Sequence, residues 1–444
     1  MTIGQATPNG SNPLDAAPLG NRQRIILALT VLIAALDGFD TMAIAFVAPA
    51  VGKDWQLGKG VIGLLLSSGL VGMAVGSIFV APWADKLGRR TIVLGCLAVL
   101  MLGAAASALA PSVAFLAASR VITGIGIGTM VVMTTLISAE FSNARIRPVA
   151  IAAIATLGFP LGGILGGLGA SAILKSGTWP TVFLVGAIAG ALMLVLVAII
   201  LPESPAFLLA RQPRDALARV NAVLHRLGHA PLAVLPAASG RSRKSYAALF
   251  ERGLARVTLR LAAINVLVAV AAYYLLNWLP QLVVDAGFPV ATGSLVSAVS
   301  GTIGLAGGTL FGALAMRFRA DRLGAGAFLA IAASLVGFGF APPLLPLLIA
   351  TAGLFGLALS GSTGTLFGIL ATSFPPQLRA AGTGLVMGVG RIGSAAGPAL
   401  AGWLFASGFT RTSVSVAFAV APFVAAMLMM TLRQAQSSAA IEKA

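Results

Sequence analysis

The stretch LIAALDGFDTMAIAFVAPAV, residues 32–51, is long and apolar enough to cross a lipid bilayer as a helix. Two carboxylates, Asp37 and Asp40, lie in its middle. A charge at the centre of a bilayer costs ~2.5–3.5 kcal/mol on insertion scales, so residues of this kind face a protein interior or a cavity rather than lipid. The stretch therefore predicts a membrane protein whose interior carries out a function.

The composition of the chain extends this prediction to its whole length. Of its 444 residues, 58% are hydrophobic and 9% are charged, whereas about a quarter of a soluble domain is charged. We count twelve apolar segments, at residues 24–50, 61–82, 91–110, 112–138, 147–173, 178–201, 257–284, 292–315, 322–341, 344–372, 380–407 and 412–432. The sequence therefore predicts an all-α membrane protein with twelve transmembrane helices.

The distribution of basic residues predicts the orientation of these helices. If the segments alternate in direction, 23 of the 29 Lys and Arg residues fall on one side. Four fall on the other side, and Arg120 and Arg391 lie within helices. The positive-inside rule then places both termini in the cytoplasm. The net charge of +17 is accounted for by this bias and by anionic lipid headgroups, so we expect a multi-pass protein of the cell inner membrane and no nucleic-acid partner.

The longest polar interval, residues 202–256, divides the apolar segments six and six. Similar glycine-containing loops follow the second and eighth segments, at 76–91 and 307–322, which indicates an internal repeat with a substrate site between the halves. The helical pattern of residues 214–228 is expected to lie along the membrane surface. The expected units are a disordered tail (1–21), an N-terminal six-helix bundle (22–201), a cytoplasmic linker (202–256), a C-terminal six-helix bundle (257–432) and a cytoplasmic tail (433–444).

Several motifs resemble those of the major facilitator superfamily. The loop GSIFVAPWADKLGRRT (76–91) and the segment PESPAFL (202–208) resemble its signatures. DGFDTMAIAFVAPA (37–50) closely resembles the signature of its aromatic acid:proton symporter family, and NWLPQLV (277–283) and GVGRIGSAAGP (388–398) fit that family too. The resemblance implies two pseudo-symmetric bundles that import an aromatic carboxylate, such as a hydroxybenzoate, together with protons.

The second half departs from the superfamily pattern at two positions. Met316 and Thr372 stand where the equivalent loops of the first half carry an aspartate and a glutamate. We therefore expect weaker ion pairing on the cytoplasmic side of the C-terminal half.

Three buried charges are the predicted proton-coupling residues. Asp37 and Asp40 are three residues apart and so share one helix face. Burial and a like charge both disfavour the charged form of a carboxylate, which suits one of the pair to exchange a proton. Arg120 is the expected partner of Asp40, and the pair resembles the Asp–Arg pair of proton-linked sugar porters. The alternatives are hydrogen-bonded structural aspartates and an arginine that only packs.

The predicted substrate site adds residues from the second half. Arg391 lies at about the depth of Asp37, ~18 Å along its helix from Arg379, and a guanidinium binds carboxylates in a bidentate manner. Asp37 itself is a candidate to orient the substrate, and a structural pairing of Arg391 with Asp37 remains the alternative. Tyr273, Asn277 and Trp278 could stack on an aromatic ring, although an ordinary packed helix face explains them equally well.

A third group of charges is predicted to form a cytoplasmic gate. Five residues flank the cytoplasmic ends of the second to fifth segments: Asp85, Arg89, Arg90, Glu140 and Arg147. Their ion pairs are expected to close the cytoplasmic side in the outward-facing state and to separate in the inward-facing state. The alternative is that the basic residues only orient the chain, but acidic residues contribute little to orientation.

No cofactor, metal or catalytic group is expected. Cys96 is the only cysteine, and His225 and His229 lie in a basic loop without an acidic partner. Acid, base and nucleophile do not converge as an enzyme requires. The alternatives are a proton-linked carrier for a non-aromatic organic acid, a sugar or a drug, and a receptor that binds such an acid without transporting it. We expect a monomer.

Overall fold

The computed structural model describes residues 13–15, 17–235, 246–251, 253–375 and 378–441, and all of their regular secondary structure is helical. The N-terminal half contains α1 (Asn21–Asp54), α2 (Lys59–Val75) with η1 (Gly76–Val80), η2 (Ala81–Trp83) and α3 (Ala84–Leu87), α4 (Arg89–Ala108), α5 (Val113–Phe141), α6 (Arg147–Ala153) with η3 (Ile154–Gly158) and α7 (Phe159–Ser176), and α8 (Trp179–Ile200). The linker contains α9 (Pro205–Arg211), α10 (Ala216–Leu227) and η4 (Tyr246–Phe250). The C-terminal half contains α11 (Leu254–Asp285), α12 (Val290–Leu314), α13 (Ala320–Phe340), α14 (Leu345–Ser373), α15 (Arg379–Ala406) and α16 (Arg411–Ile441).

The described chain contains 11 helical spans that are long and apolar enough to cross a membrane. The twelfth helix of the bundle is α15, which carries Arg391 and seven glycines and packs between α2 and α11. The predicted all-α fold with twelve transmembrane helices is confirmed, and the boundaries differ from those predicted by a few residues. One difference is larger, because α16 continues to Ile441 and so includes most of the predicted C-terminal tail.

Close helix contacts within the N-terminal half depend on glycine. A Cβ atom at Gly162 of α7 would lie 1.7 Å from the Ala35 carbonyl oxygen of α1, and one at Gly72 of α2 would lie 2.1 Å from the Val121 oxygen of α5. Only glycine permits these approaches. Small residues serve this role in membranes because helices there associate through packing rather than through the hydrophobic effect.

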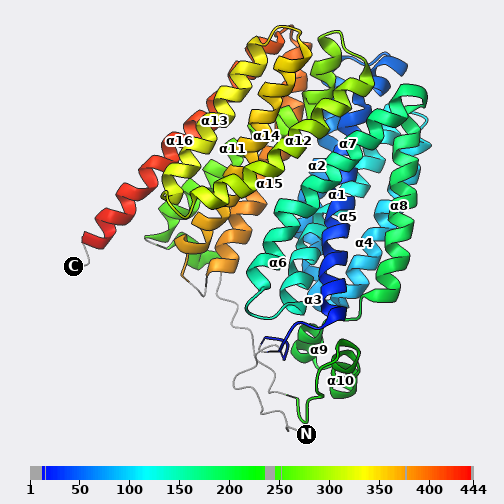
Figure 1. Ribbon diagram of the computed structural model, residues 1–444, viewed down its shortest axis with the longest axis vertical. Helices are drawn as coiled ribbons and strands as arrows, with labels where there is room; N and C mark the ends of the chain where they lie inside the picture. The colour runs from blue at the N-terminus through cyan, green and yellow to red at the C-terminus, as the bar shows by residue number, and fades with distance from the viewer. Residues whose placement is uncertain (1–12, 16, 236–245, 252, 376–377, 442–444) are drawn as a thin grey trace.

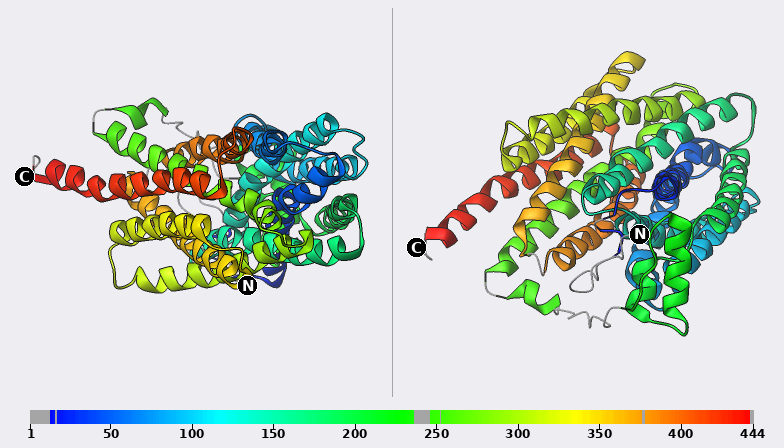
Figure 2. Two further views of the ribbon diagram at one scale, coloured as in Figure 1. Left: turned by 90° about the horizontal axis from the view of Figure 1, so that it is seen from above. Right: turned by 60° about the horizontal axis from the view of Figure 1, so that its bottom comes forward.

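The two halves share a hydrophobic core at one end of the molecule. We call the end that carries α9, α10 and the start of α1 the linker end, and the opposite end the far end (Figure 1). One hydrophobic cluster combines far-end residues of α1, α2 and α8 with most of the C-terminal half, whereas the linker end of the N-terminal half has a separate cluster. Figures 1 and 2 show the two groups of helices side by side, diverging toward the linker end. The halves are therefore packed together at the far end.

An ion pair reinforces the closed far end. Lys59, at the start of α2, donates to both carboxylate oxygens of Asp285, at the end of α11, at 2.6 and 2.5 Å. Gln281, one turn before Asp285, donates to the same carboxylate at 2.9 Å. Both charged side chains are about one-third exposed, and an exposed pair contributes only about 0.2–1 kcal/mol. It is nevertheless a contact between the halves that must break when the far end opens.

The Lys59–Asp285 pair predicts a measurable shift in conformation. Lys59→Asp places two carboxylates together, so we expect the open-far-end population to rise by up to about fivefold. The double variant Lys59→Asp/Asp285→Lys should restore the original population. Opening can be followed by the distance between spin labels at Leu109 and Leu344, two exposed far-end positions on different halves. The labels are attached in a variant that lacks Cys96. Lys175→Asp changes an exposed lysine that has no ion pair among the described residues and should leave the distance between the labels unchanged. An identical shift there would contradict the assignment.

Two predicted segments differ from expectation at the linker end. Residues 13–20, assigned to a disordered tail, pack against the N-terminal half as far as the structure describes them: Leu14 is fully buried, and Asp15 pairs with Arg147. The amphipathic helix expected on the membrane surface is α10. It instead buries Val220 and Leu224 in the linker-end cluster, because this cluster offers its apolar face a protein surface. Figure 2 shows α9 and α10 beneath the N-terminal helices only.

Candidate functional site

The first part of the site is a buried ion pair inside the N-terminal half. Arg120 of α5 and Asp40 of α1 are each 1% exposed and form a salt bridge. The guanidinium donates to Asp40 Oδ1 at 3.2 Å and to the Asp40 carbonyl oxygen at 2.9 Å. It also stacks over the ring of Phe183 at 5.3 Å. The structure thus brings together the predicted Asp40–Arg120 pair, and hydrogen bonds satisfy most of its buried polar atoms, as burial of charge requires.

Asp37 is in the opposite situation. It is 1% exposed, and neither of its carboxylate oxygens has a hydrogen-bond partner within the described part of the chain. Thr41, one turn further along α1, donates to the Asp37 carbonyl oxygen at 2.7 Å and not to its carboxylate. A charged carboxylate without partners is very costly in this environment. Proton exchange at Asp37 therefore stays a prediction, and it would require a compensating charge nearby.

Arg391 is the predicted candidate for that charge. It lies on α15 in the C-terminal half. It is partly exposed, and it makes no hydrogen bond or ion pair with any residue that the structure describes. An unpaired guanidinium in one half and an unpartnered carboxylate in the other leave both groups available to a ligand.

The predicted aromatic cluster on α11 is only partly available. Tyr273 contacts both hydrophobic clusters, which places it between the halves. Asn277 donates to the Tyr273 carbonyl oxygen at 3.0 Å, and its own amide oxygen is buried without a partner in the described structure. Trp278 is fully buried, and its indole N–H donates to the Pro398 carbonyl oxygen at 3.0 Å. It packs α11 against α15, and its contact with a substrate stays a prediction.

Gln281 is a buried polar residue of α11 that the sequence analysis did not single out. It is 6% exposed, and its amide oxygen is buried without a partner among the residues described. It lies four residues after Asn277, so both amides share one face of α11. That spacing was visible in the sequence and could have identified it.

The predicted gate residues form pairs within the N-terminal half. Arg89 is 3% exposed and pairs with Glu140 at 3.2 Å and with Asp85 at 3.0 Å. Arg147 pairs with Asp15 and donates to the Ala139 carbonyl oxygen at 2.8 Å. These ion pairs are formed in the structure described here, and their expected separation in the inward-facing state stays a prediction. They stabilise the N-terminal half itself, and any contact with the other half remains a prediction.

Arg90 differs from its neighbours in the predicted gate. Its backbone N–H and that of Arg89 donate to Glu203 Oε1, at 3.3 and 2.9 Å. Glu203 thereby satisfies the first N–H groups of α4, a role that suits a carboxylate at a helix N-terminus. The preceding Gly88 has φ +96°, and a Cβ there would meet the Glu203 carboxylate at 2.3 Å. The PESPAFL segment is therefore tied to the loop at 76–91, and the Arg90 side chain lies against the end of α8, where it donates to the Ala198 carbonyl oxygen.

The comparison with known sequences decides the family. The model of the Major Facilitator Superfamily matches residues 30–344. The chain belongs to the Major Facilitator Superfamily. It is 28% identical to the gallate transporter of Pseudomonas putida, over 94% of this chain and 93% of that one. It is also 28% identical to the 4-hydroxybenzoate transporter PcaK of Acinetobacter baylyi, over 94% of each chain.

Solved structures of Major Facilitator Superfamily members agree in fold. A bacterial homologue of the human lysosomal transporter Spinster, in an inward-facing conformation, matches with a TM-score of 0.72 at 19% identity, over 94% of this chain and 98% of that one. A D-xylose-proton symporter matches with a TM-score of 0.70 at 19% identity, over 91% and 96%. The family predicted from the sequence motifs is confirmed, and the protein is a multi-pass membrane transporter without enzymatic activity.

Proposed function

We propose that this transporter imports an aromatic carboxylate together with protons across the inner membrane of a bacterium, with both termini in the cytoplasm. The linker end is then the cytoplasmic end, as the distribution of basic residues suggests. The named relatives, which are transporters for gallate and 4-hydroxybenzoate, support an aromatic acid as the substrate. The structure described here then corresponds to the inward-facing state.

The observation that carries this proposal is that each half contributes one charged group without a partner among the described residues, Asp37 in the N-terminal half and Arg391 in the C-terminal half. One group is a buried carboxylate without partners, and the other is a cation without a counter-ion in the described chain. An anionic substrate bound to Arg391 supplies the missing counter-charge. A proton on Asp37 then removes the repulsion between its carboxylate and that of the substrate. Charge balance thereby couples substrate binding to proton binding.

Asp40 and Arg120 have a different role in this proposal. Because they already satisfy each other, they fix the position of α1 against α5 within the N-terminal half. Protonation of Asp40 would weaken that pair and allow the helices to shift. The two carboxylates on one helix face thus act in sequence, with Asp37 exchanging the proton near the substrate and Asp40 sensing it.

Asn277 supplies a polar contact in the proposed site. Its unpartnered amide oxygen can accept a hydrogen bond from a ring hydroxyl group. A site built to hydrogen-bond a substrate hydroxyl discriminates strongly against analogues that lack it. We therefore expect hydroxylated benzoates to bind more tightly than benzoate itself.

A thermal-shift screen of purified protein against benzoates, hydroxybenzoates, aliphatic acids and sugars identifies the ligand class. We expect stabilisation by hydroxylated aromatic acids only, since binding to the folded state raises the melting temperature. Counterflow of the best ligand in proteoliposomes then distinguishes transport from reception. Exchange of labelled for unlabelled acid supports a carrier, whereas binding without exchange supports a receptor.

Arg391→Lys tests how the carboxylate is bound. Lysine keeps the charge but loses the planar fork that binds two carboxylate oxygens, so we expect the Kd to rise by about tenfold, equivalent to ~1.4 kcal/mol. Isothermal calorimetry with the acid and its methyl ester separates charge from shape. The ester should bind both proteins weakly and equally. An unchanged Kd for the acid would make Arg391 a structural residue.

A further inference from the structure

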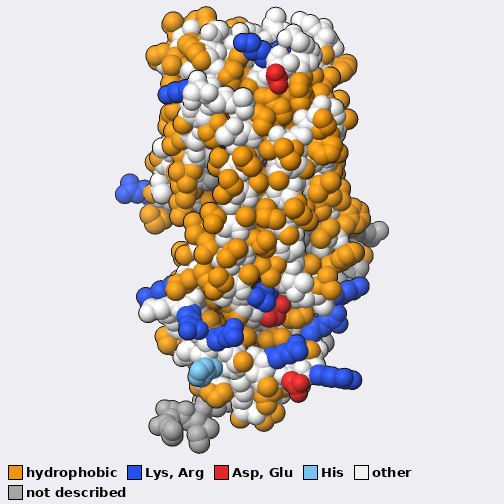
Figure 3. All heavy atoms as spheres, turned by 90° about the vertical axis from the view of Figure 1, so that its right-hand side faces the viewer, with side chains coloured by type: hydrophobic (Ala, Val, Ile, Leu, Met, Phe, Trp, Pro, Cys, Tyr) orange, Lys and Arg blue, Asp and Glu red, His pale blue; other side chains and the backbone are white. Residues whose placement is uncertain are grey.

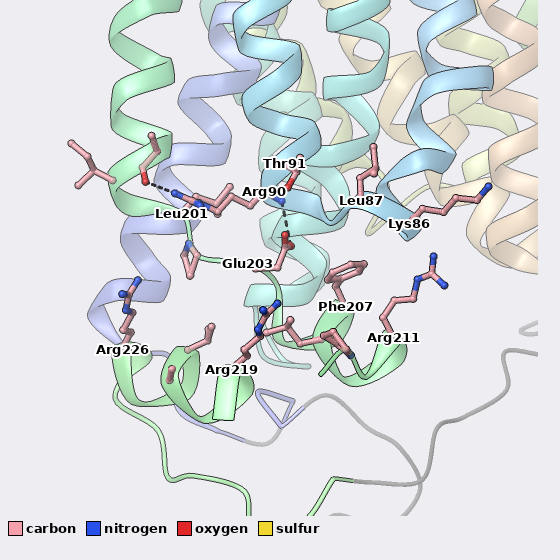
Figure 4. A pocket seen from close by; sticks show the side chains of 17 residues that line it. Lys86, Leu87, Arg90, Thr91, Leu201, Glu203, Phe207, Arg211, Arg219 and Arg226 are labelled. Carbon is pink, nitrogen blue, oxygen red and sulfur yellow. Dashed lines mark hydrogen bonds between the residues drawn. The ribbon is translucent and has the colours of Figure 1, made fainter. Parts of the chain in front are cut away.

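A basic cavity lies at the linker end, away from the site between the halves. Its volume is about 920 Å³, within the range of ligand-binding cavities. Its walls come from the start of α4, the end of α8 and the linker helices α9 and α10 (Figure 4). Five cations and one acid line the cavity: Lys86, Arg90, Arg211, Arg219, Arg226 and Glu203. Apolar side chains, among them Leu87 and Ile199, line the rest of it.

The positive charge of this cavity is not balanced by protein. Its one acid, Glu203, is committed to the backbone N–H groups at the start of α4 and of Ser204. None of the five cations forms an ion pair with a carboxylate among the residues described. Arg90 donates to the Ala198 carbonyl oxygen at 2.7 Å, and its Nε is buried without a partner there. Guanidinium groups without a carboxylate partner can bind a phosphate through charged hydrogen bonds.

The apolar rim of the cavity indicates what carries the phosphate. Ile199 is 76% exposed and belongs both to the cavity wall and to the outer face of α8. Leu192, Val195 and Leu196 continue that face toward the middle of the bundle and are 63, 57 and 42% exposed. Their spacing places them on one stripe of the helix. Figure 3 shows this side of the molecule as an apolar surface above a band of basic side chains.

We propose that this cavity binds the headgroup of an anionic phospholipid, with the acyl chains lying along the outer face of α8. The phosphate is held between Arg90 and the arginines of α10, as basic pockets beside transmembrane helices hold acidic headgroups. The lipid fastens the linker helices to α4 and α8. This site is independent of the substrate and does not rest on the proposed transport function.

Native mass spectrometry of the purified full-length chain tests the proposal. Phosphatidylglycerol, phosphatidylcholine and glycerol 3-phosphate are the probes, and they separate an anionic lipid from a zwitterionic lipid and from a free phosphate. Wild type should bind the first phosphatidylglycerol about tenfold more tightly than phosphatidylcholine. Glycerol 3-phosphate at a hundredfold excess should not displace it, because it lacks the chains that contact α8.

The variant Arg219→Gln/Arg226→Gln removes two exposed cations of the cavity without touching the core and should abolish that preference. Arg219→Lys/Arg226→Lys keeps the charge and should retain most of it. The matched control Arg317→Gln/Arg322→Gln removes two exposed arginines from the C-terminal half and should bind as wild type. Equal phosphatidylglycerol binding by the cavity variant and the control would overturn the proposal. Displacement by glycerol 3-phosphate would also overturn it, in favour of a soluble phosphate ligand.

Discussion

Replacing Asp37 by asparagine is expected to abolish accumulation of substrate driven by a pH gradient, while exchange of substrate across the membrane continues. Asparagine has nearly the same shape but cannot take up or release a proton. Because both carboxylate oxygens of Asp37 lack partners in the described structure, the substitution breaks no hydrogen bond and should leave the fold intact. The expected loss of accumulation therefore reports on coupling rather than on stability.

The pH dependence of transport provides the second readout for Asp37→Asn. Wild-type uptake should increase as the external pH falls, whereas counterflow by the variant should be insensitive to pH. The melting temperature of the variant should lie within a few degrees of wild type. If Asp37→Asn still accumulates substrate fully under a pH gradient, the coupling proton is carried elsewhere, and Asp40 becomes the residue to examine.

Arg120→Ala is expected to destabilise the protein by about 3–5 kcal/mol, the usual effect of leaving a buried charge without its partner. Asp40 would lose its salt bridge and a hydrogen bond to its backbone oxygen, and Phe183 would lose the guanidinium above its ring. We expect poor yield of folded protein and a clear fall in the melting temperature. Asp40→Asn/Arg120→Gln, which removes both charges, should recover much of the stability but none of the proton coupling.

Arg391→Ala is the matched control for Arg120→Ala. It removes the other arginine that lies within a transmembrane helix, but this one has no ion pair in the described chain. We therefore expect its melting temperature to be nearly that of wild type, while its substrate binding is lost. If the two variants are equally unstable, Arg391 has a structural partner and the division between a paired and an unpaired arginine is wrong.

The fold was largely predictable because membrane helices leave a strong pattern. Length, hydropathy and the bias of basic residues located the spans, and motifs in short loops indicated the family. The span of α15 was also predicted, at 380–407, although it contains Arg391 and seven glycines. Those glycines allow close contact with α2 and α11. The packing of Leu14 and α10 was missed, since a short polar-flanked segment gives no sign of which surface will cover it.

The site was predictable where chemistry alone decides it. A buried carboxylate in an apolar helix needs an explanation, and that requirement identified Asp37, Asp40 and Arg120. The burial of Trp278 could not be predicted, because it depends on contacts of α15 that sequence spacing does not contain. The same holds for Lys59 and Asp285, which are 226 residues apart and meet only because the two halves close at one end.

The central claim is that proton movement drives the uptake of an aromatic carboxylate through this chain. The most direct measurement is uptake of labelled 4-hydroxybenzoate into proteoliposomes that are acidic outside, compared with protein-free liposomes that correct for passive entry of the weak acid. We predict accumulation well above the protein-free level, collapse of that excess on adding a protonophore, and no excess with Asp37→Asn. Uptake by wild type that equals the protein-free level, or that ignores the protonophore, would contradict the account.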